Sequence, residues 1–224
     1  MKNEQNQIAI VTVNYNKAQS TRELIESLEK SEYKDFTVHI VDNNSSEECQ
    51  EELRKIMDKS KIKISIIHNN SNSGWGMAIN QAVDWITEPL TLVLNNDTRV
   101  KPNTIGELVK YMKENTEVGI CGTRILNEDG TLATAGGRFD WITRLTGITR
   151  ENKARHGAKQ PVILGDTEYV DDCAWIILTD VMRKPEGRYP VYLFLYFEEL
   201  YLIRAARQMG YKIAYNPLAE VVHS

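Results

Sequence analysis

The chain has 224 residues, of which 42% are hydrophobic and 26% are charged, and these proportions are typical of a globular protein rather than a disordered one. A formal net charge of −4 offers no electrostatic attraction for nucleic acid, so we expect no nucleic-acid partner. The 3 cysteines form neither a metal-binding motif nor a disulfide framework, and we interpret them as reduced thiols of a cytoplasmic protein.

The ends of the chain carry no signal for a membrane. The first residues lack an apolar stretch of signal-peptide length, and no run approaches the roughly 18 apolar residues that a membrane helix needs. The sequence stops at Ser224, directly after a strand-like segment. We therefore expect a cytoplasmic location, with peripheral association at the inner face of the membrane only through a C-terminal region beyond Ser224.

The first hundred residues alternate strand-like and helix-like patterns. Runs rich in β-branched residues predict four strands, at Ile8–Val13, Phe36–Asp42, Ile62–His68 and Leu90–Asn95. An amphipathic stripe from Trp75 to Ile86 predicts the third of the helices between them. Such alternation predicts a parallel sheet with right-handed crossovers. The chain lacks both GxGxxG after the first strand and GxxxxGK[ST], which argues against dinucleotide dehydrogenases and P-loop enzymes.

The second half of the sequence is less regular. Pro102 is expected to open a helix, because proline is tolerated in the first turn. Val118–Thr123 is predicted as a fifth strand, and NEDG at Asn127–Gly130 is a hairpin turn signal. A helix is predicted from about Phe197 to Met209, and two short strands are expected to flank Pro217.

Polar residues follow each of the first four predicted strands. The clusters contain Asn14 and Asn16, then Asp42–Asn44, then His68–Asn70, and finally Asn95–Asp97. A single cluster of this kind is usually turn chemistry, because Asn and Asp bond their own backbone. Parallel strands, however, place their carboxyl ends at one edge of the sheet. Four clusters at one edge indicate a polar pocket able to bind a nucleotide.

Several motifs occur in a recognisable order along the chain. They are VTVNYN, IVDNNSSE, NSGWGMAIN (Asn72–Asn80), Asn95–Asp97, FLYFEELYLIRAARQMGY (Phe194–Tyr211) and NPLAEVVH. Together they resemble the GT-A glycosyltransferases of family 2, especially the rhamnosyltransferase-like branch, over nearly the whole chain. The resemblance implies an α/β, Rossmann-like GT-A fold with a mixed, mainly parallel central sheet flanked by helices.

The resemblance also implies an activity. Residues 1–224 would form a single catalytic domain, with residues 1–100 binding the nucleotide sugar and residues 101–224 binding the acceptor. The implied reaction is an inverting, metal-dependent transfer of a sugar, with rhamnose favoured, from a dTDP- or UDP-linked donor. The acceptor would be a hydroxyl of a cell-surface glycan or a lipid-linked glycan. Such a reaction needs a cation for the leaving diphosphate and a carboxylate for the acceptor hydroxyl.

The cation is expected to be Mn²⁺ or Mg²⁺. Asp97 is the expected ligand, because few protein groups suffice when phosphate oxygens and waters complete the octahedron. By resemblance His223 is the second ligand, and imidazole suits Mn²⁺ better than Mg²⁺. A penultimate histidine is equally compatible with a free chain end. Asn95 stands where an acid is often found, and its amide would bond a ribose hydroxyl.

The other strand-end residues are expected to bind the donor. By resemblance Asp42 accepts from the nucleobase or the ribose, while Asn43 and Asn44 set the following turn. Gly74 and Gly76 would let the backbone approach the diphosphate near a helix N-terminus. Asn80 would touch the ribose or only its neighbouring loop. The full expected set is Asn14, Asp42, Asn72, Gly74, Gly76, Asn80, Asn95, Asn96 and Asp97.

The late signature is expected to supply the catalytic base. The family's Glu-Asp pair appears here as Glu198 and Glu199, and by resemblance Glu199 deprotonates the acceptor. The additional methylene moves the carboxylate by roughly 1 Å, which leaves the assignment between the two open. Tyr201 replaces a further family Asp, and Arg204 matches an arginine that supports the motif.

Four residues are expected to bind substrate, namely Asp171, Asp172, Trp175 and Arg204. Asp171 and Asp172 stand where the family shapes the sugar pocket. Trp175 follows closely, and its aromatic face suits a sugar, although tryptophan is more often part of a core.

Two alternatives to an active transferase stay open. A nucleotide-sugar-binding pseudoenzyme is suggested by Asn95, by the second glutamate of the late motif and by Tyr201. A sugar-phosphate nucleotidyltransferase would share the sheet topology. It should carry a basic, Gly-rich loop after the first strand, and NYNKAQSTRE is not such a loop.

Overall fold

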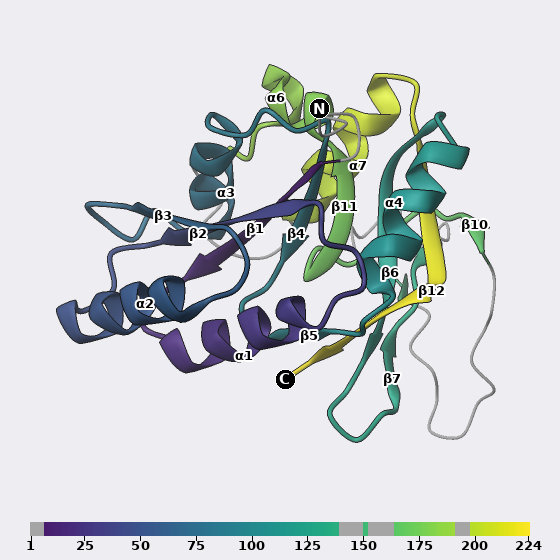
Figure 1. Ribbon diagram of the computed structural model, residues 1–224. Helices are drawn as coiled ribbons and strands as arrows, with labels where there is room; N and C mark the ends of the chain where they lie inside the picture. The colour runs from purple at the N-terminus through teal and green to yellow at the C-terminus, as the bar shows by residue number, and fades with distance from the viewer. Residues whose placement is uncertain (1–6, 139–149, 152–163, 191–197) are drawn as a thin grey trace, which may run out of the picture.

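Figure 1 shows a computed structural model of the chain, which describes residues 7–138, 150–151, 164–190 and 198–224. The helices are α1 (Ala18–Glu29), α2 (Glu47–Lys59), α3 (Trp75–Val83), α4 (Thr104–Glu114), α6 (Thr179–Arg183), the 3₁₀ helix η2 (Pro185–Gly187) and α7 (Glu198–Gln208). The strands of the first half are β1 (Ile8–Asn14), β2 (Phe36–Asp42), β3 (Ile64–His68), β4 (Leu90–Leu94) and β5 (Thr98–Val100). The later strands are β6 (Val118–Leu126), β7 (Leu132–Thr134), β8 (Gly137–Arg138), β9 (Arg150–Glu151), β10 (Gly165–Asp166), β11 (Ala174–Leu178) and β12 (Lys212–His223).

One mixed sheet runs through the described residues. Its main path has the order β10-β12-β6-β11-β4-β1-β2-β3, with β5 paired to β12 and β7 paired to β6. The segment β4-β1-β2-β3 is parallel, whereas β11 runs antiparallel to both β4 and β6. Strands β8 and β9 form a separate antiparallel pair. The expected α/β architecture with a mixed central sheet is confirmed.

Helices cover both faces of the sheet, because the central strands are apolar on both sides. Ile8 and Ile10 point towards α1, α2 and α4, and they pack in one buried cluster with Leu24 of α1. The alternate residues Ala9 and Val11 lie in a second cluster with residues of α3, α6 and α7. Figure 1 accordingly shows α1 and α2 below the sheet and α3 and α6 above it. This two-sided burial explains the nearly continuous apolar runs of β1 and β4.

Most predicted elements agree with the structure to within two residues. β2 has the predicted bounds, and the NEDG turn is closed by a bond from Gly130 N–H to the Asn127 carbonyl oxygen (2.9 Å). α4 begins at Thr104 rather than at Pro102, because the Pro102 carbonyl oxygen accepts from the backbone N–H of Glu32 (2.8 Å).

The two strands predicted around Pro217 form a single strand, β12. Its pairing with β6 is interrupted between Asn216 and Glu220. The proline therefore falls at an irregularity where no ladder hydrogen bond is required of it.

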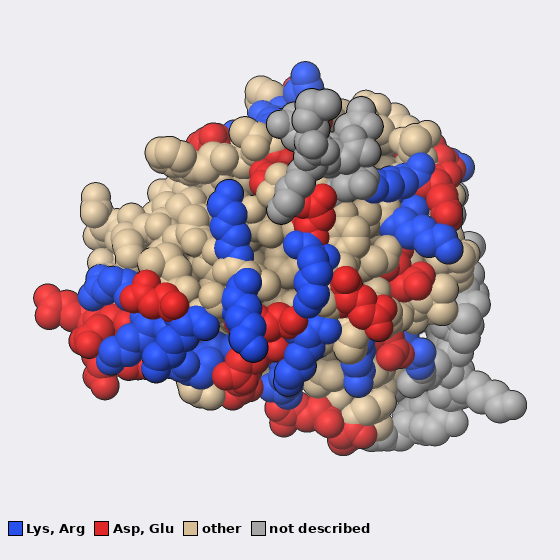
Figure 2. Space-filling model, viewed as in Figure 1, with Lys and Arg blue, Asp and Glu red and all other residues tan. Residues whose placement is uncertain are grey.

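Charges of both signs are intermixed over α1 and α2, as Figure 2 shows for one face of the molecule. Arg22 of α1 pairs with Glu52 of α2 (2.9 Å), and Arg99 of β5 pairs with Glu23 of α1 (2.9 Å). These ion pairs tie the two helices and β5 together at the surface. Within the described ranges, each helix is too short or too polar to cross a bilayer.

Candidate functional site

The polar strand ends meet at one edge of the sheet, as the sequence predicts. Asn14, the last residue of β1, is paired in register with Asp42 of β2, which is paired in turn with His68 of β3. Because β11 is antiparallel to β4, its first residues reach the same edge, and Asn95 N–H donates to the Cys173 carbonyl oxygen (2.8 Å). Six segments distant in sequence therefore contribute to this edge once the end of β12 is included.

Asp97 and His223 approach each other at this edge. The turn after β4 is closed by a bond from Thr98 N–H to the Asn95 carbonyl oxygen (3.1 Å), and β5 then pairs Thr98 with His223 of β12. The Nε2 atom of His223 consequently lies 3.1 Å from Oδ1 of Asp97. Each side chain keeps about a third of its surface exposed, at 33% for Asp97 and 34% for His223.

Each member of this pair stabilises the charged form of the other. The hydrogen bond and the charge of Asp97 raise the pKa of His223 above its ordinary value, against the opposing effect of burial. Burial alone would raise the pKa of Asp97, but the hydrogen bond and charge of His223 outweigh it, and the pKa of Asp97 is lowered. Asp171 adds negative charge near His223 and also contributes to its raised pKa.

The pair fits a divalent cation to which the protein supplies only a few ligands. One carboxylate and one imidazole converge, and both are ligands that Mn²⁺ accepts. Within the described ranges, no three His, Cys, Asp or Glu side chains are grouped to hold a metal ion. A cation bound here would therefore take most of its coordination from a diphosphate and water.

Asp171 and Asp172 lie near the Cys173 thiol, and Asp171 also lies near His223. The backbone N–H of Cys173 donates to Asp171 Oδ1 (3.0 Å), which fixes the turn into β11. Burial together with the charges of Asp171 and Asp172 raises the pKa of the Cys173 thiol well above its ordinary value, and Asp97 contributes to the same shift. The thiol is thus neutral, and three carboxylates are gathered around it.

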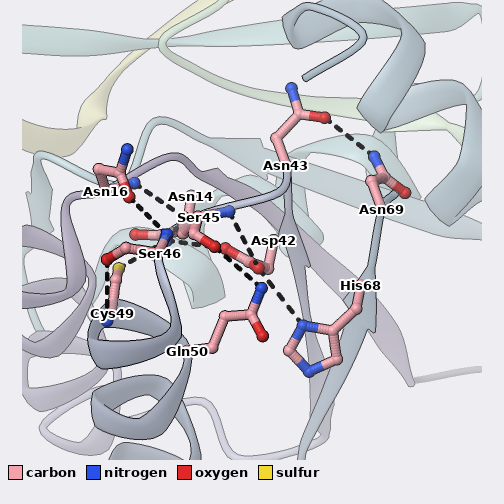
Figure 3. Close-up of polar contacts among 10 residues, drawn as sticks. All are labelled: Asn14, Asn16, Asp42, Asn43, Ser45, Ser46, Cys49, Gln50, His68 and Asn69. Carbon is pink, nitrogen blue, oxygen red and sulfur yellow. Dashed lines mark hydrogen bonds and ion pairs between the residues drawn. The ribbon is translucent and has the colours of Figure 1, made fainter. Parts of the chain in front are cut away.

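Figure 3 shows a buried network around Asn14 and Asp42. Asn14 Nδ2 donates to Asp42 Oδ1 (3.2 Å) and to Ser45 Oγ (3.0 Å), and Asp42 Oδ2 also lies 3.3 Å from His68 Nδ1. Asn14 and Asp42 are both fully buried. The Asp42 carboxylate also accepts from Ser45 N–H (3.4 Å) and so holds the loop that begins at Asn43, while its expected contact with a nucleobase stays a prediction.

Thr21 extends the network to the turn that carries Asp97. Its hydroxyl donates to Asn14 Oδ1 (3.0 Å) and accepts from Asn96 Nδ2 (3.2 Å). Asn96, which is half-buried, thus contacts α1 through its side chain. A single threonine in an amphipathic helix carries no sequence signal, so sequence reasoning does not find Thr21.

Asn43 does more than set the turn after β2, which is the role that the sequence predicts for it. Its Nδ2 donates to Asn72 Oδ1 (2.8 Å) and to the Gly74 carbonyl oxygen (3.2 Å), while its Oδ1 accepts from Asn69 Nδ2 (2.9 Å). Ser73 N–H donates to the same Oδ1 (3.2 Å). One buried amide thereby shapes the loop that precedes α3. Gly74, with φ of 85°, takes the left-handed conformation that this loop requires.

Gly76 and Asn80, which the sequence assigns to donor binding, both contact Tyr189. A Cβ atom at Gly76 would lie 2.8 Å from Cβ of Tyr189, so the missing side chain makes room for that residue. Asn80 Nδ2 donates to the Tyr189 carbonyl oxygen (2.8 Å), and the Tyr189 N–H donates to Asn80 Oδ1 (3.0 Å). Both motif residues therefore contact Tyr189, which lies in none of the sequence motifs.

The substrate-binding expectation for Trp175 is corrected by its burial. The side chain is 0% exposed and packs in the cluster beneath α3 and α7, so its face is not available to a sugar. Glu199 is 9% exposed and accepts from Tyr169 Oη (3.3 Å). Arg204 is exposed on α7, while the side chain of Glu198 lies outside the described part of the structure.

Comparison with known proteins shows which family the chain is similar to. The family described as "Glycosyl transferase family 2" matches residues 9–184. No curated protein sequence matches the chain.

Three solved structures illustrate the fold. TarS 1-349 of S. aureus has a TM-score of 0.73 at 14% identity, over 97% of this chain and 60% of that one. GalNAc-T7 with UDP, GalNAc and Mn²⁺ has a TM-score of 0.78 at 16% identity, over 100% and 44%. The mannosyltransferase PcManGT of Pyrobaculum calidifontis with GDP-Man and Mn²⁺ has a TM-score of 0.71 at 14% identity, over 96% and 56%. The chain thus spans 60% or less of the length of each of these proteins.

Proposed function

Because the chain belongs to glycosyl transferase family 2, we propose that it transfers a sugar from a nucleoside diphosphate to an acceptor hydroxyl with a divalent cation. The observation that carries this proposal is the meeting of Asp97 and His223, 126 residues apart in sequence, with 3.1 Å between Nε2 and Oδ1. Two groups able to bind Mn²⁺ thus lie at the sheet edge where α/β proteins bind their ligands.

Asp97 and His223 would hold the cation, Mn²⁺ or Mg²⁺, in this proposal. When bound, it neutralises charge on the diphosphate leaving group. His223 must be neutral to act as a ligand, so cation binding releases the proton that Asp97 stabilises on the imidazole. Asp171 lies close enough to influence His223 and adds to the negative field that attracts a cation.

The donor nucleoside would lie over the loops that Asp42 and Asn43 hold in place. Asn95 has its side chain partly exposed at the same edge, where its amide can bond a ribose hydroxyl. The loop that Asn43 organises, with Asn72 and Gly74, leads into the N-terminus of α3, whose dipole favours phosphate. We assign residues 1–100 to donor binding and residues 101–224 to acceptor binding within one catalytic domain.

Glu199 would be the base that accepts the proton of the attacking hydroxyl, giving inversion by direct displacement. Tyr169 Oη holds its carboxylate, and Tyr169 stands two residues before Asp171 on the chain that enters the site. Glu198 stays the second candidate for this role, with Arg204 supporting the helix that carries both. We favour rhamnose linked to dTDP, or a UDP-linked sugar, as donor, and a cell-surface or lipid-linked glycan as acceptor.

Calorimetric titration with UDP and dTDP, with and without Mn²⁺, tests the donor site. We expect binding that needs Mn²⁺ in the wild type and is lost in Asp97→Ala. Incubation with a panel of nucleotide sugars then tests chemistry, since release of nucleoside diphosphate reports hydrolysis or transfer. Nucleotide binding that is the same with and without Mn²⁺, and unaffected by Asp97→Ala, would contradict the proposal.

One observation favours a second function, the binding of nucleotide sugars without transfer. Glu199 is nearly buried and already engaged by Tyr169, so its carboxylate is poorly placed to meet a solvent-borne acceptor in this conformation. Tight, Mn²⁺-dependent binding of a nucleotide sugar without turnover of any donor in the panel would establish this alternative.

A further inference from the structure

Helix α3 is joined to a segment 109 residues further along the chain by hydrogen bonds and an ion pair. The amide of Asn80 donates to the carbonyl oxygen of Tyr189 and accepts from the N–H of the same residue, at 2.8 Å and 3.0 Å. Arg188 donates to the Asn80 carbonyl oxygen (2.7 Å) and forms an ion pair with Asp84 just after α3. Side-chain and backbone groups of Asn80 thus both hold the Arg188–Tyr189 segment.

The ring of Tyr189 is seated on α3 at Gly76. An added Cβ at Gly76 would lie 2.8 Å from Cβ and 2.9 Å from Cγ of Tyr189, closer than side chains normally approach. Trp75 meets the ring edge-on, with centroids 5.5 Å apart and an interplanar angle of 72°. Tyr189 is buried by these contacts. Trp75, Gly76 and Asn80, which belong to one motif, therefore all contact Tyr189.

The same segment supports α7 on its other side. η2 ends at Gly187, directly before Arg188, and it contacts α7. Tyr189 also belongs to the buried cluster that contains Leu202 and Ile203 of α7. The Arg188–Tyr189 segment thus lies between α3, which follows the proposed donor loop, and α7, which carries Glu199.

We propose that Asn80 and Gly76 are positioning residues that dock the Arg188–Tyr189 segment on α3 and thereby place Glu199 relative to the donor. This inference rests on the proposed function, because placement of Glu199 matters only if that carboxylate meets an acceptor. Both polar atoms of the Asn80 side chain are engaged by the Tyr189 backbone, so its contribution passes through Tyr189 rather than through the ribose. A shift of roughly 1 Å at a catalytic group can lower a rate about 100-fold.

Gly76→Ala tests the docking without altering a polar group. Gly106→Ala is the matched control, because Gly106 also lies in the first turn of a helix and an added Cβ there meets no atom within 4 Å. Hydrogen exchange of the α7 amides measures the docking directly. Calorimetry with Mn²⁺ and UDP or dTDP, whichever the wild type binds, measures donor affinity, and the transfer assay measures kcat.

In Gly76→Ala we expect α7 amides to exchange about tenfold faster than in the wild type and kcat to fall at least about tenfold. Nucleotide affinity should stay within about twofold, and Gly106→Ala should match the wild type in all three measurements. Asn80→Asp serves as a second variant if Gly76→Ala does not fold. It keeps the acceptor for Tyr189 N–H but turns a carboxylate oxygen towards the Tyr189 carbonyl, so the same changes are expected.

Two results would overturn the inference. One is unchanged exchange of the α7 amides in a folded Gly76→Ala protein. The other is a loss of nucleotide affinity as large as the loss of kcat, which would make Gly76 part of the donor site instead. If the wild type neither binds nucleotide nor transfers sugar while Gly76→Ala still loosens α7, the proposed function fails and the docking of Arg188 and Tyr189 on α3 is supported.

Discussion

Replacing Thr21 by valine should destabilise the protein by about 1–3 kcal/mol, although the two side chains have nearly the same shape. Thr21 is fully buried, and its hydroxyl is a donor to Asn14 Oδ1 (3.0 Å) and an acceptor from Asn96 Nδ2 (3.2 Å). The variant leaves the buried oxygen of Asn14 without this donor, and an unsatisfied buried group costs about 1–3 kcal/mol. Asn96 keeps a longer bond to the Lys17 carbonyl oxygen (3.4 Å).

Urea denaturation measures the change in the free energy of unfolding, and a thermal melt should show a fall of about 2–4 °C for each kcal/mol. Thr12→Val is the matched control. Thr12 is equally buried in β1, but its Oγ1 has no hydrogen-bond partner within the described residues, so its replacement should be neutral or stabilising. Equal stabilities of Thr21→Val and Thr12→Val would refute the importance assigned to the Thr21 hydroxyl.

Three further predictions follow from the site. Asn43→Ala should lower stability by about 2–3 kcal/mol and weaken nucleotide affinity about tenfold in calorimetry, because the loop before α3 loses its buried amide; unchanged affinity would contradict this. Asp97 and His223 should give a pH dependence, measured by unfolding at each pH. The raised pKa of His223 contributes stability below its ordinary value of 6.5 that is lost as pH rises through the higher folded value. The lowered pKa of Asp97 contributes stability above its ordinary value of 3.8 that is lost as pH falls through the lower folded value. His223→Gln should flatten both effects, and Mn²⁺ affinity should rise with pH as the His223 proton leaves. Trp175→Phe should lower stability by about 1–3 kcal/mol while the donor KM stays within about twofold; the opposite pattern would return Trp175 to the sugar site.

The first four strands, and the sheet edge at which their polar ends meet, are accessible from sequence because both depend on local patterns. β1, β2 and β4 are buried on both faces, so their apolar runs stand out and their polar ends mark the sheet edge. β12 is harder to predict, because Pro217 reads as a break when the pairing with β6 is unknown. The pairing of β12 with β6 on both sides of Asn216–Glu220 shows that the irregularity lies within one strand.

The roles of individual motif residues are much less accessible, because their partners lie far away in sequence. Gly76 and Asn80 belong to a motif that suggests nucleotide contact, yet both are used by Tyr189. Thr21 bridges two strand-end clusters from a helix that shows only an amphipathic pattern. A sequence motif does not distinguish the residues that contact a ligand from those that position other residues.

Burial separates the polar strand-end residues into two groups that look alike in sequence. Asn14, Asp42 and Asn43 are sealed from solvent with their polar atoms engaged by other loops, whereas Asp97 and His223 keep about a third of their side-chain surface exposed. Each buried polar side chain would cost about 1–3 kcal/mol if its hydrogen bonds were lost. The loops at this edge therefore have one strongly preferred arrangement before any ligand binds. A site fixed in advance loses less conformational entropy on binding. Under the proposed function, the buried residues would therefore act on donor affinity through preorganisation, and Asp97 and His223 would make the direct contacts with cation and donor.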